Sequence, residues 1–182
     1  MPFSQKCTII KIMYLKRFLF LISVTLCLVG CNYQLYAPIV EVKPAIAKYR
    51  YAYIIPTGSV TSGLSSEGDG YTKSISPSEV IAGDLMQRGY SILPQINQDL
   101  IDKTMIVNYG EVGVRDIGYQ IYTKEVIIQF RDAQSQDLIC SGKAEGLVDF
   151  LWGSSTEVDA VVFAIKKALD SIYEQSKPYL EQ

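Results

Sequence analysis

Histidine is absent from all 182 residues of the chain, and this absence excludes several kinds of active site. Catalytic triads and Cys-His pairs are excluded, because both need an imidazole to activate the nucleophile. Zinc sites built on histidine are excluded as well, and the four cysteines lack the spacing of a zinc finger. We therefore expect no catalytic histidine, no metal and no cofactor.

Glycine-rich nucleotide-binding motifs are also missing. The segment 68–74, Gly-Asp-Gly-Tyr-Thr-Lys-Ser, is superficially similar to a phosphate-binding loop but has no Gly-Lys pair at the required spacing. No Gly-x-Gly-x-x-Gly motif follows an expected strand. We interpret 68–74 as part of a plain loop.

Acidic side chains are absent from the first 31 residues, which carry Lys6, Lys11, Lys16 and Arg17. All 19 acidic residues but only 13 of the 17 basic residues lie after Cys31, so that part has a formal net charge of −6. Phosphate backbones bind to a positive field, and this charge therefore argues against a nucleic-acid partner. The asymmetry indicates a leader that is removed after export.

A short apolar run, 18–30, follows Lys16-Arg17. In a helix it spans about 20 Å at ~1.5 Å per residue, whereas the hydrocarbon core of a bilayer is ~30 Å thick. A basic region followed by a short apolar one is typical of a signal peptide rather than of a permanent membrane span. Met1 and Met13 both remain candidate start residues.

The apolar run ends in Leu28-Val29-Gly30-Cys31, which resembles the lipobox of bacterial lipoprotein precursors. The resemblance implies cleavage between Gly30 and Cys31, a diacylglyceryl group on the Cys31 thiol and an acyl group such as palmitate on the new amino terminus. The membrane is then a partner through these acyl chains, since two or more chains anchor a protein stably. The alternative is an ordinary signal peptide, or a short buried helix with an incidental cysteine.

The residues just after Cys31 bear on the place of the protein in the cell envelope. In Gram-negative lipoproteins an acidic residue there can favour the inner membrane, and acidic runs can direct surface export in some groups. The segment 32–36, Asn-Tyr-Gln-Leu-Tyr, has neither, so the resemblance implies an outer-membrane lipoprotein that faces the periplasm. We expect a signal peptide at 1–30, a lipidated tether at 31–46, one domain at 47–177 and a C-terminal tail at 178–182.

Periodicity in the mature chain predicts four strands and two helices. The first helix is expected to begin with a capping box of Ser76 and Glu79, and the second with a capping box of Ser154 and Glu157 and to stop at Pro178. Strands are expected at 48–55, 103–114, 119–131 and 137–147, with a flexible loop at 57–73.

The order β-α-β-β-β-α predicts an α+β two-layer sandwich, in which both helices cover one face of a mainly antiparallel sheet. Small residues in the last strand, Cys140, Gly142 and Ala144, would let a helix lie close to the sheet. Gly83 in the first helix is expected to allow a strand to approach closely. The layout is similar to that of small envelope lipoproteins of unknown function.

Two features of the expected domain are candidates for function. Cys140 has no cysteine partner nearby and falls on an apolar strand face, which predicts a buried, unreactive thiol. The single tryptophan lies in Phe150-Leu151-Trp152, in an expected loop, where an exposed apolar cluster would mark a contact with a partner. The alternative is a hydrophobic staple that packs near the start of the second helix.

Three functional hypotheses follow. The leading one is a non-enzymatic envelope lipoprotein that binds a protein partner or a polymer near the membrane. The second is an envelope hydrolase, which needs two carboxyl groups in one cleft and a raised pKa on one of them. The third is a small-ligand binder with the 57–73 loop as a lid. The candidate carboxylates for the hydrolase are Glu111, Asp116, Glu125 and Glu145.

Overall fold

The computed structural model describes residues 34–64, 71–118, 121–149 and 155–181. The chain divides into two compact units, Met1–Gln34 and Leu35–Gln182, and the described helices and strands belong to the second. These elements are β1 (Ile39–Val42), the 3-10 helix η1 (Pro44–Lys48), β2 (Tyr51–Ile54), β3 (Val60–Leu64), β4 (Tyr71–Ile75), α2 (Pro77–Gln87), β5 (Ser91–Ile92), the 3-10 helix η2 (Gln98–Lys103), β6 (Thr104–Gly118), β7 (Ile121–Asp132), β8 (Leu138–Asp149) and α3 (Glu157–Leu180).

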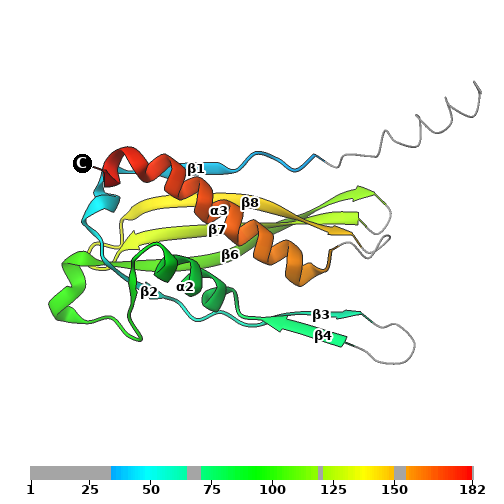
Figure 1. Cartoon of the computed structure of the whole chain (residues 1–182), viewed down its shortest axis with the longest axis horizontal. Coiled ribbons are helices and arrows are strands. Elements are labelled where there is room, and N and C mark those ends of the chain that lie inside the picture. The colour runs from blue at the N-terminus through cyan, green and yellow to red at the C-terminus, as the bar shows by residue number, and fades with distance from the viewer. Residues whose placement is uncertain (1–33, 65–70, 119–120, 150–154, 182) are drawn as a thin grey trace, which may run out of the picture. The chain divides into compact units, whose positions relative to one another are not determined.

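A six-stranded sheet in the order β1-β8-β7-β6-β2-β5 forms one layer of the unit (Figure 1). Its pairings are antiparallel from β1 through β6 and parallel where β2 meets β6 and β5. The expected combination of a sheet with helices is confirmed, but the expected order of elements along the chain lacks β1, β3, β4 and β5, and two of the five pairings are parallel. β2 and β6 run parallel because the long connection between them returns the chain to the same end of the sheet.

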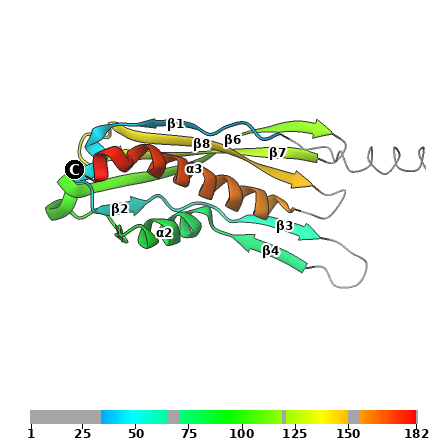
Figure 2. The same ribbon diagram turned by 45° about the horizontal axis from the view of Figure 1, so that its top comes forward.

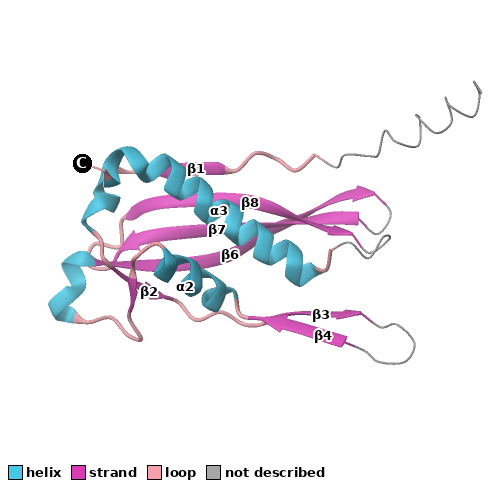
Figure 3. Cartoon of the chain, viewed as in Figure 1, coloured by secondary structure: helices cyan, strands magenta, loops and turns pink. Residues whose placement is uncertain are grey.

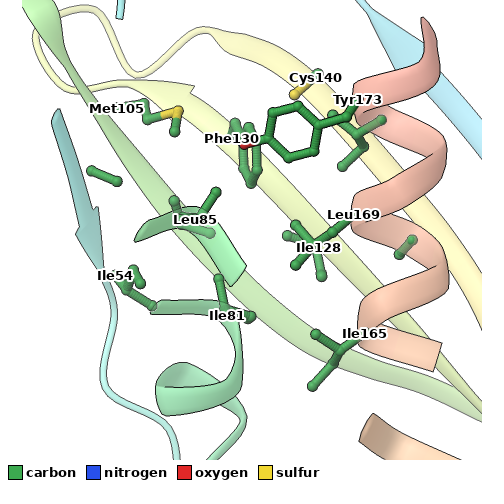
Figure 4. Close-up of a cluster of buried hydrophobic side chains, with 14 of the residues drawn as sticks. Ile54, Ile81, Leu85, Met105, Ile128, Phe130, Cys140, Ile165, Leu169 and Tyr173 are labelled. Carbon is green, nitrogen blue, oxygen red and sulfur yellow. The ribbon is translucent and has the colours of Figure 1, made fainter. Parts of the chain in front are cut away.

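Both helices cover the same face of this sheet, as predicted (Figure 3). α3 packs on β7 and β8, while α2 packs on β2 and β5 and against α3. Between the layers, Ile81 and Leu85 of α2 meet Phe130 of β7 and Leu169 of α3, and all four are fully buried (Figure 4). Full burial of such a side chain contributes about 1.5–3 kcal/mol, so this core holds the helices on the sheet.

Glycines in β8 let α3 approach the sheet closely, which confirms the prediction for the small residues of this strand. A Cβ on Gly142 would lie 2.8 Å from the Ile172 side chain and 2.9 Å from the Ala168 carbonyl. A Cβ on Gly146 would overlap the Ala160 carbonyl. The prediction for Gly83 is wrong, because a Cβ there meets nothing within 4 Å.

The helix ends differ in detail from the sequence prediction. α2 begins after Ser76, but the Ser76 side chain makes no cap bond and its hydroxyl lies 2.8 Å from that of Ser78. α3 begins two residues later than expected, with Thr156 as N-cap and a capping box to Asp159. The helix also continues through Pro178 to Leu180. Pro178 lies near the end of α3, where its ring removes the helical donor of the Glu174 carbonyl, and Glu174 is an exposed residue.

The segment expected to be a tether belongs in part to the domain. Within 31–46, β1 adds to the sheet beside β8, in register from Ile39 opposite Lys143 to Val42 opposite Cys140. η1 follows, and its Ile46 is fully buried in the core. The sequence did not predict this strand, because Pro38 and Pro44 flank it and the residues around it show little periodicity. Any free tether is therefore shorter than predicted.

Strands also occupy much of the expected loop at 57–73. β3 and β4 pair antiparallel over five residues each and form a second, two-stranded sheet (Figure 2). Lys73 of β4 forms an ion pair with Asp159 of α3, which fixes this sheet to the helix layer. The expectation of one long flexible loop is wrong for these residues, since cross-strand pairing, which composition does not report, orders them.

Candidate functional site at the start of the domain

The predicted lipid-attachment and contact residues lie outside the described residues. These are Gly30 and Cys31 and the cluster Phe150-Leu151-Trp152. Asp149 and Ser155 flank the 150–154 segment and are described, and their backbones pair, since the Asp149 amide donates to the Ser155 carbonyl at 3.1 Å. This bridge marks the end of β8 and the approach to α3.

A buried carboxylate holds the first residues of the domain. Glu145 of β8 is 3% exposed, although it lies on the sheet face opposite the helices. It accepts two hydrogen bonds from Arg115 of β6, Nε to Oε1 at 3.0 Å and Nη2 to Oε2 at 2.7 Å. The Thr123 hydroxyl of β7 donates to Oε1 at 3.3 Å, and the backbone amide of Tyr36 donates to Oε2 at 3.0 Å. These four residues are called the Glu145 cluster below.

The Glu145 cluster keeps its carboxylate charged. The hydrogen bonds from Arg115 hold the pKa of Glu145 below its usual value despite the opposing effect of burial, and the Tyr36 amide acts in the same direction. The Arg115 guanidinium also lies over the Tyr36 ring, 4.1 Å from its centre. A buried charge with this many donors is satisfied, so the cluster acts as a clamp on the chain at Tyr36.

A second contact fixes the same residue from the helix side. Lys167 of α3 donates from Nζ to the Tyr36 carbonyl at 3.3 Å. β1 is antiparallel to β8, so the chain before Ile39 runs toward the end of β8 at Asp149. The domain therefore begins at the end of the sheet where Asp149 pairs with Ser155.

The hydrolase hypothesis required two carboxylates in one cleft, and strand pairing does bring two candidates together. Glu125 of β7 lies directly opposite Glu145 of β8. Each has its own cation, however, since Lys143 lies 2.8 Å from Glu125 and Arg115 holds Glu145. The lowered pKa of Glu145 is the opposite of what a proton-donating acid needs.

The other two candidate carboxylates are placed differently. Glu111 lies 3.5 Å from Lys124 and faces the helix layer, and Asp116 is exposed near the end of β6. No group of three or more His, Cys, Asp or Glu in the described residues is arranged to hold a metal ion. Among the described helices, none has the length and apolar character needed to cross a membrane.

Cys140 is a free thiol in the core, as predicted. It is fully buried between β7, β8 and α3, near Phe130 and Tyr173 (Figure 4). Burial raises the pKa of the thiol far above its ordinary value, so the reactive thiolate is suppressed. The side chain therefore serves packing.

The Glu145 cluster was not recognised as a unit from the sequence. Glu145 was a candidate, but Arg115, Thr123 and Tyr36 were not. The sequence gives only a weak signal for an ion pair between Arg115 and Glu145, because their contact depends on the register of three strands. The register includes irregularities between Glu111 and Gly113, which sequence alone does not locate.

Comparisons with known proteins show a distant fold likeness. No protein-family model and no curated protein matches the chain. Among solved structures it is similar to the PelC dodecamer from Paraburkholderia phytofirmans, at 14% identity over 75% of this chain and 98% of that chain, with a TM-score of 0.47.

Two further structures give the same picture. A single-residue variant of PelC from the same organism covers 75% of this chain and 95% of its own, with 14% identity and a TM-score of 0.45. A DUF330 protein from Xanthomonas campestris is 16% identical over 79% of this chain and 91% of its own, with a TM-score of 0.33. Likeness at this level carries no argument about function or assembly.

Proposed function

We propose that the chain is the precursor of a bacterial lipoprotein, cut before Cys31, whose acyl chains hold a non-enzymatic α+β module at a membrane of the cell envelope. The motif Leu28-Val29-Gly30-Cys31 and the basic leader support the anchor. The segment 32–36 carries no acidic residue, which favours the outer membrane and a periplasmic domain.

One structural observation supports the module's place beside a bilayer, namely that the chain is clamped at Tyr36. The Tyr36 amide and carbonyl are both bound, by Glu145 and Lys167. Five residues from Cys31 to Tyr36 extend at most about 18 Å. A module anchored in this way has little freedom to move away from the membrane.

The same geometry supports a role for the 150–154 segment in binding. Its flanking residues Asp149 and Ser155 lie at the end of β8, toward which the chain before Ile39 runs. In the proposed arrangement that end faces the bilayer surface. We assign Phe150-Leu151-Trp152 the contact with an envelope protein or polymer held near the membrane, since aromatic residues supply much of the affinity at such contacts.

The anchor is tested by the intact mass and membrane fractionation of two matched cysteine variants. Cys31→Ser should remove the mass of the acyl chains and leave the leader uncut, while Cys27→Ser, four residues earlier in the leader, should be processed as the wild type is. A native protein that begins upstream of Cys31, or that carries a free Cys31 thiol and washes off membranes, would overturn the proposal.

The binding role is tested by crosslinking in intact cells. Trp152→Ala should weaken the recovery of a crosslinked partner at least several-fold. Phe163→Ala is the matched control, because Phe163 is a 50% exposed aromatic residue on α3. A protein that stays a lone monomer, or a partner that is recovered equally from wild type and Trp152→Ala, would refute the assigned contact.

A further inference from the structure

A cavity of ≈ 340 Å³ lies at the opposite end of the sheet from the Glu145 cluster. It opens beside Arg50, which precedes β2, and the first residue of β2 pairs with Thr104 at the start of β6, whereas Arg115 lies near the end of β6. We call it the tyrosine pocket. Its lining includes Tyr49, Arg50, Arg88, Tyr90 and Tyr173.

The lining is cationic and aromatic, and none of its side chains is a carboxylate. Arg50 is exposed, and its Nη1 donates to the carbonyls of Ala47 and Tyr49, each at 3.0 Å. Within the described part of the chain no carboxylate forms an ion pair with Arg50. Its positive charge is therefore available to a ligand at the pocket mouth.

Arg88 has a different role in the pocket. Asp84 and Asp170 both form ion pairs with it, and these carboxylates offset its charge and fix its position. Its guanidinium lies over the Tyr173 ring, 4.0 Å from the ring centre. Arg88 thus forms part of the pocket wall, and Arg50 is the residue that attracts an anion.

Aromatic rings form the apolar part of the pocket. The rings of Tyr90 and Tyr173 are 6.2 Å apart and tilted by 53°. Gly89 between α2 and Tyr90 has a φ of +89°, a conformation that favours glycine, and so no side chain covers the rim there. Aromatic side chains with a few polar or charged groups among them are typical of the lining of a small-ligand site.

We propose that the tyrosine pocket binds a carboxylate carried on a ring, with the carboxylate on the Arg50 guanidinium and the ring against Tyr90. A planar guanidinium binds a carboxylate through two parallel hydrogen bonds, and a tyrosine face accepts either a sugar ring or an aromatic ring. The cavity has room for one such unit. The site does not depend on a lipid anchor, so this proposal and the proposed function can be refuted independently.

The test is calorimetric titration of the purified protein, expressed from the full chain and with the amino terminus that the cell gives it, in detergent at low salt. Glucuronate and benzoate are the two ring carboxylates, glucose and benzyl alcohol are their neutral counterparts, and acetate is the carboxylate without a ring. We expect one ring carboxylate to bind with a Kd on the order of 1 mM, and its neutral counterpart and acetate at least about tenfold more weakly. Which of the two binds distinguishes a sugar acid from an aromatic acid.

Two variants separate the pocket from general charge effects. Arg50→Ala, at an exposed residue, should weaken binding at least about tenfold, and Tyr90→Leu should weaken it while acetate binding stays unchanged. Arg131→Ala removes a similar charge on β7, outside the pocket, and should leave the Kd within about twofold. The absence of binding by both ring carboxylates, acetate binding as tight as theirs, or an equal loss in Arg131→Ala would each overturn the proposal.

Discussion

Glu145 and Arg115 form a two-bond ion pair across the strand that separates them. Glu145 lies on β8 and Arg115 on β6, and Thr123 of the intervening β7 donates to the same carboxylate. The amide of Tyr36 completes the set. One buried carboxylate thus joins three strands to the first residues of the domain, which is why it is the most informative place to perturb.

Replacement of this carboxylate should loosen the N-terminal segment. Glu145→Gln removes the charge from the acceptor of two Arg115 hydrogen bonds and should lower the free energy of unfolding by about 1–3 kcal/mol. Hydrogen exchange at the Tyr36 amide should become faster, because its acceptor is weakened. Urea unfolding and amide exchange measure the two effects. Glu41→Gln, at an exposed position of β1, is the control and should change neither quantity. Unaltered Tyr36 exchange in Glu145→Gln would contradict the clamp.

Acid should destabilise the domain through Asp132. Burial alone would raise the pKa of this carboxyl, but hydrogen bonds from Lys48, Tyr49 and the amides of Ser135 and Gln134 together hold it far below its usual value. A lowered pKa in the folded state contributes stability that is present above the unfolded pKa of ~4 and is lost as the pH falls below it.

The measurement is the free energy of unfolding from pH 6 down to pH 2. The wild type should lose stability below about pH 4. Asp132→Asn should have a lower free energy of unfolding at pH 6 and should lose less of it as the pH falls. Asp137→Asn, an exposed residue in the same turn region, is the control. Equal pH slopes for the wild type and Asp132→Asn would show that Asp132 is not the titrating group.

Two glycine-to-alanine changes should have opposite effects. A Cβ on Gly146 would overlap the backbone carbonyl of Ala160, which a rotamer change cannot relieve, so Gly146→Ala should cost at least about 1–3 kcal/mol. Gly83 is inside α2 with open space around it, so Gly83→Ala should stabilise the protein by about 0.5–1 kcal/mol. Thermal unfolding of both variants checks the signs, and a stable Gly146→Ala would show that α3 can lift off β8.

The Cys140 thiol should be inert in the folded protein. It is fully buried, and burial raises its pKa, so a thiol reagent should label it only when the domain opens. The labelling rate of a Cys31→Ser, Cys27→Ser, Cys7→Ser protein should rise with urea in parallel with unfolding. Fast labelling without denaturant would mean that the contact between α3 and β8 opens in the native state.

Sequence patterns located the helices and the long strands well, because their signals are local. The stripe of Val158, Ile165 and Leu169 predicts the buried face of α3, and these residues are fully buried. The small residues of β8 predicted close helix packing for a similar reason. Local patterns gave the wrong N-cap where two candidate residues lie close together in the sequence. The N-cap of α3 is Thr156 and not the predicted Ser154.

The amino-acid sequence by itself determined the basic leader, the cysteine motif at 28–31, the lack of histidine and the apolar stripes of both helices, since each of these is a property of neighbouring residues. Only the tertiary structure decided that β1 joins the sheet, that Arg115 and Glu145 meet across β7, and that Arg50 lines a pocket together with three tyrosines. These contacts join residues far apart in the chain. They depend on strand register and on the parallel crossover between β2 and β6. The packing of the core as a whole sets both, and no single segment does.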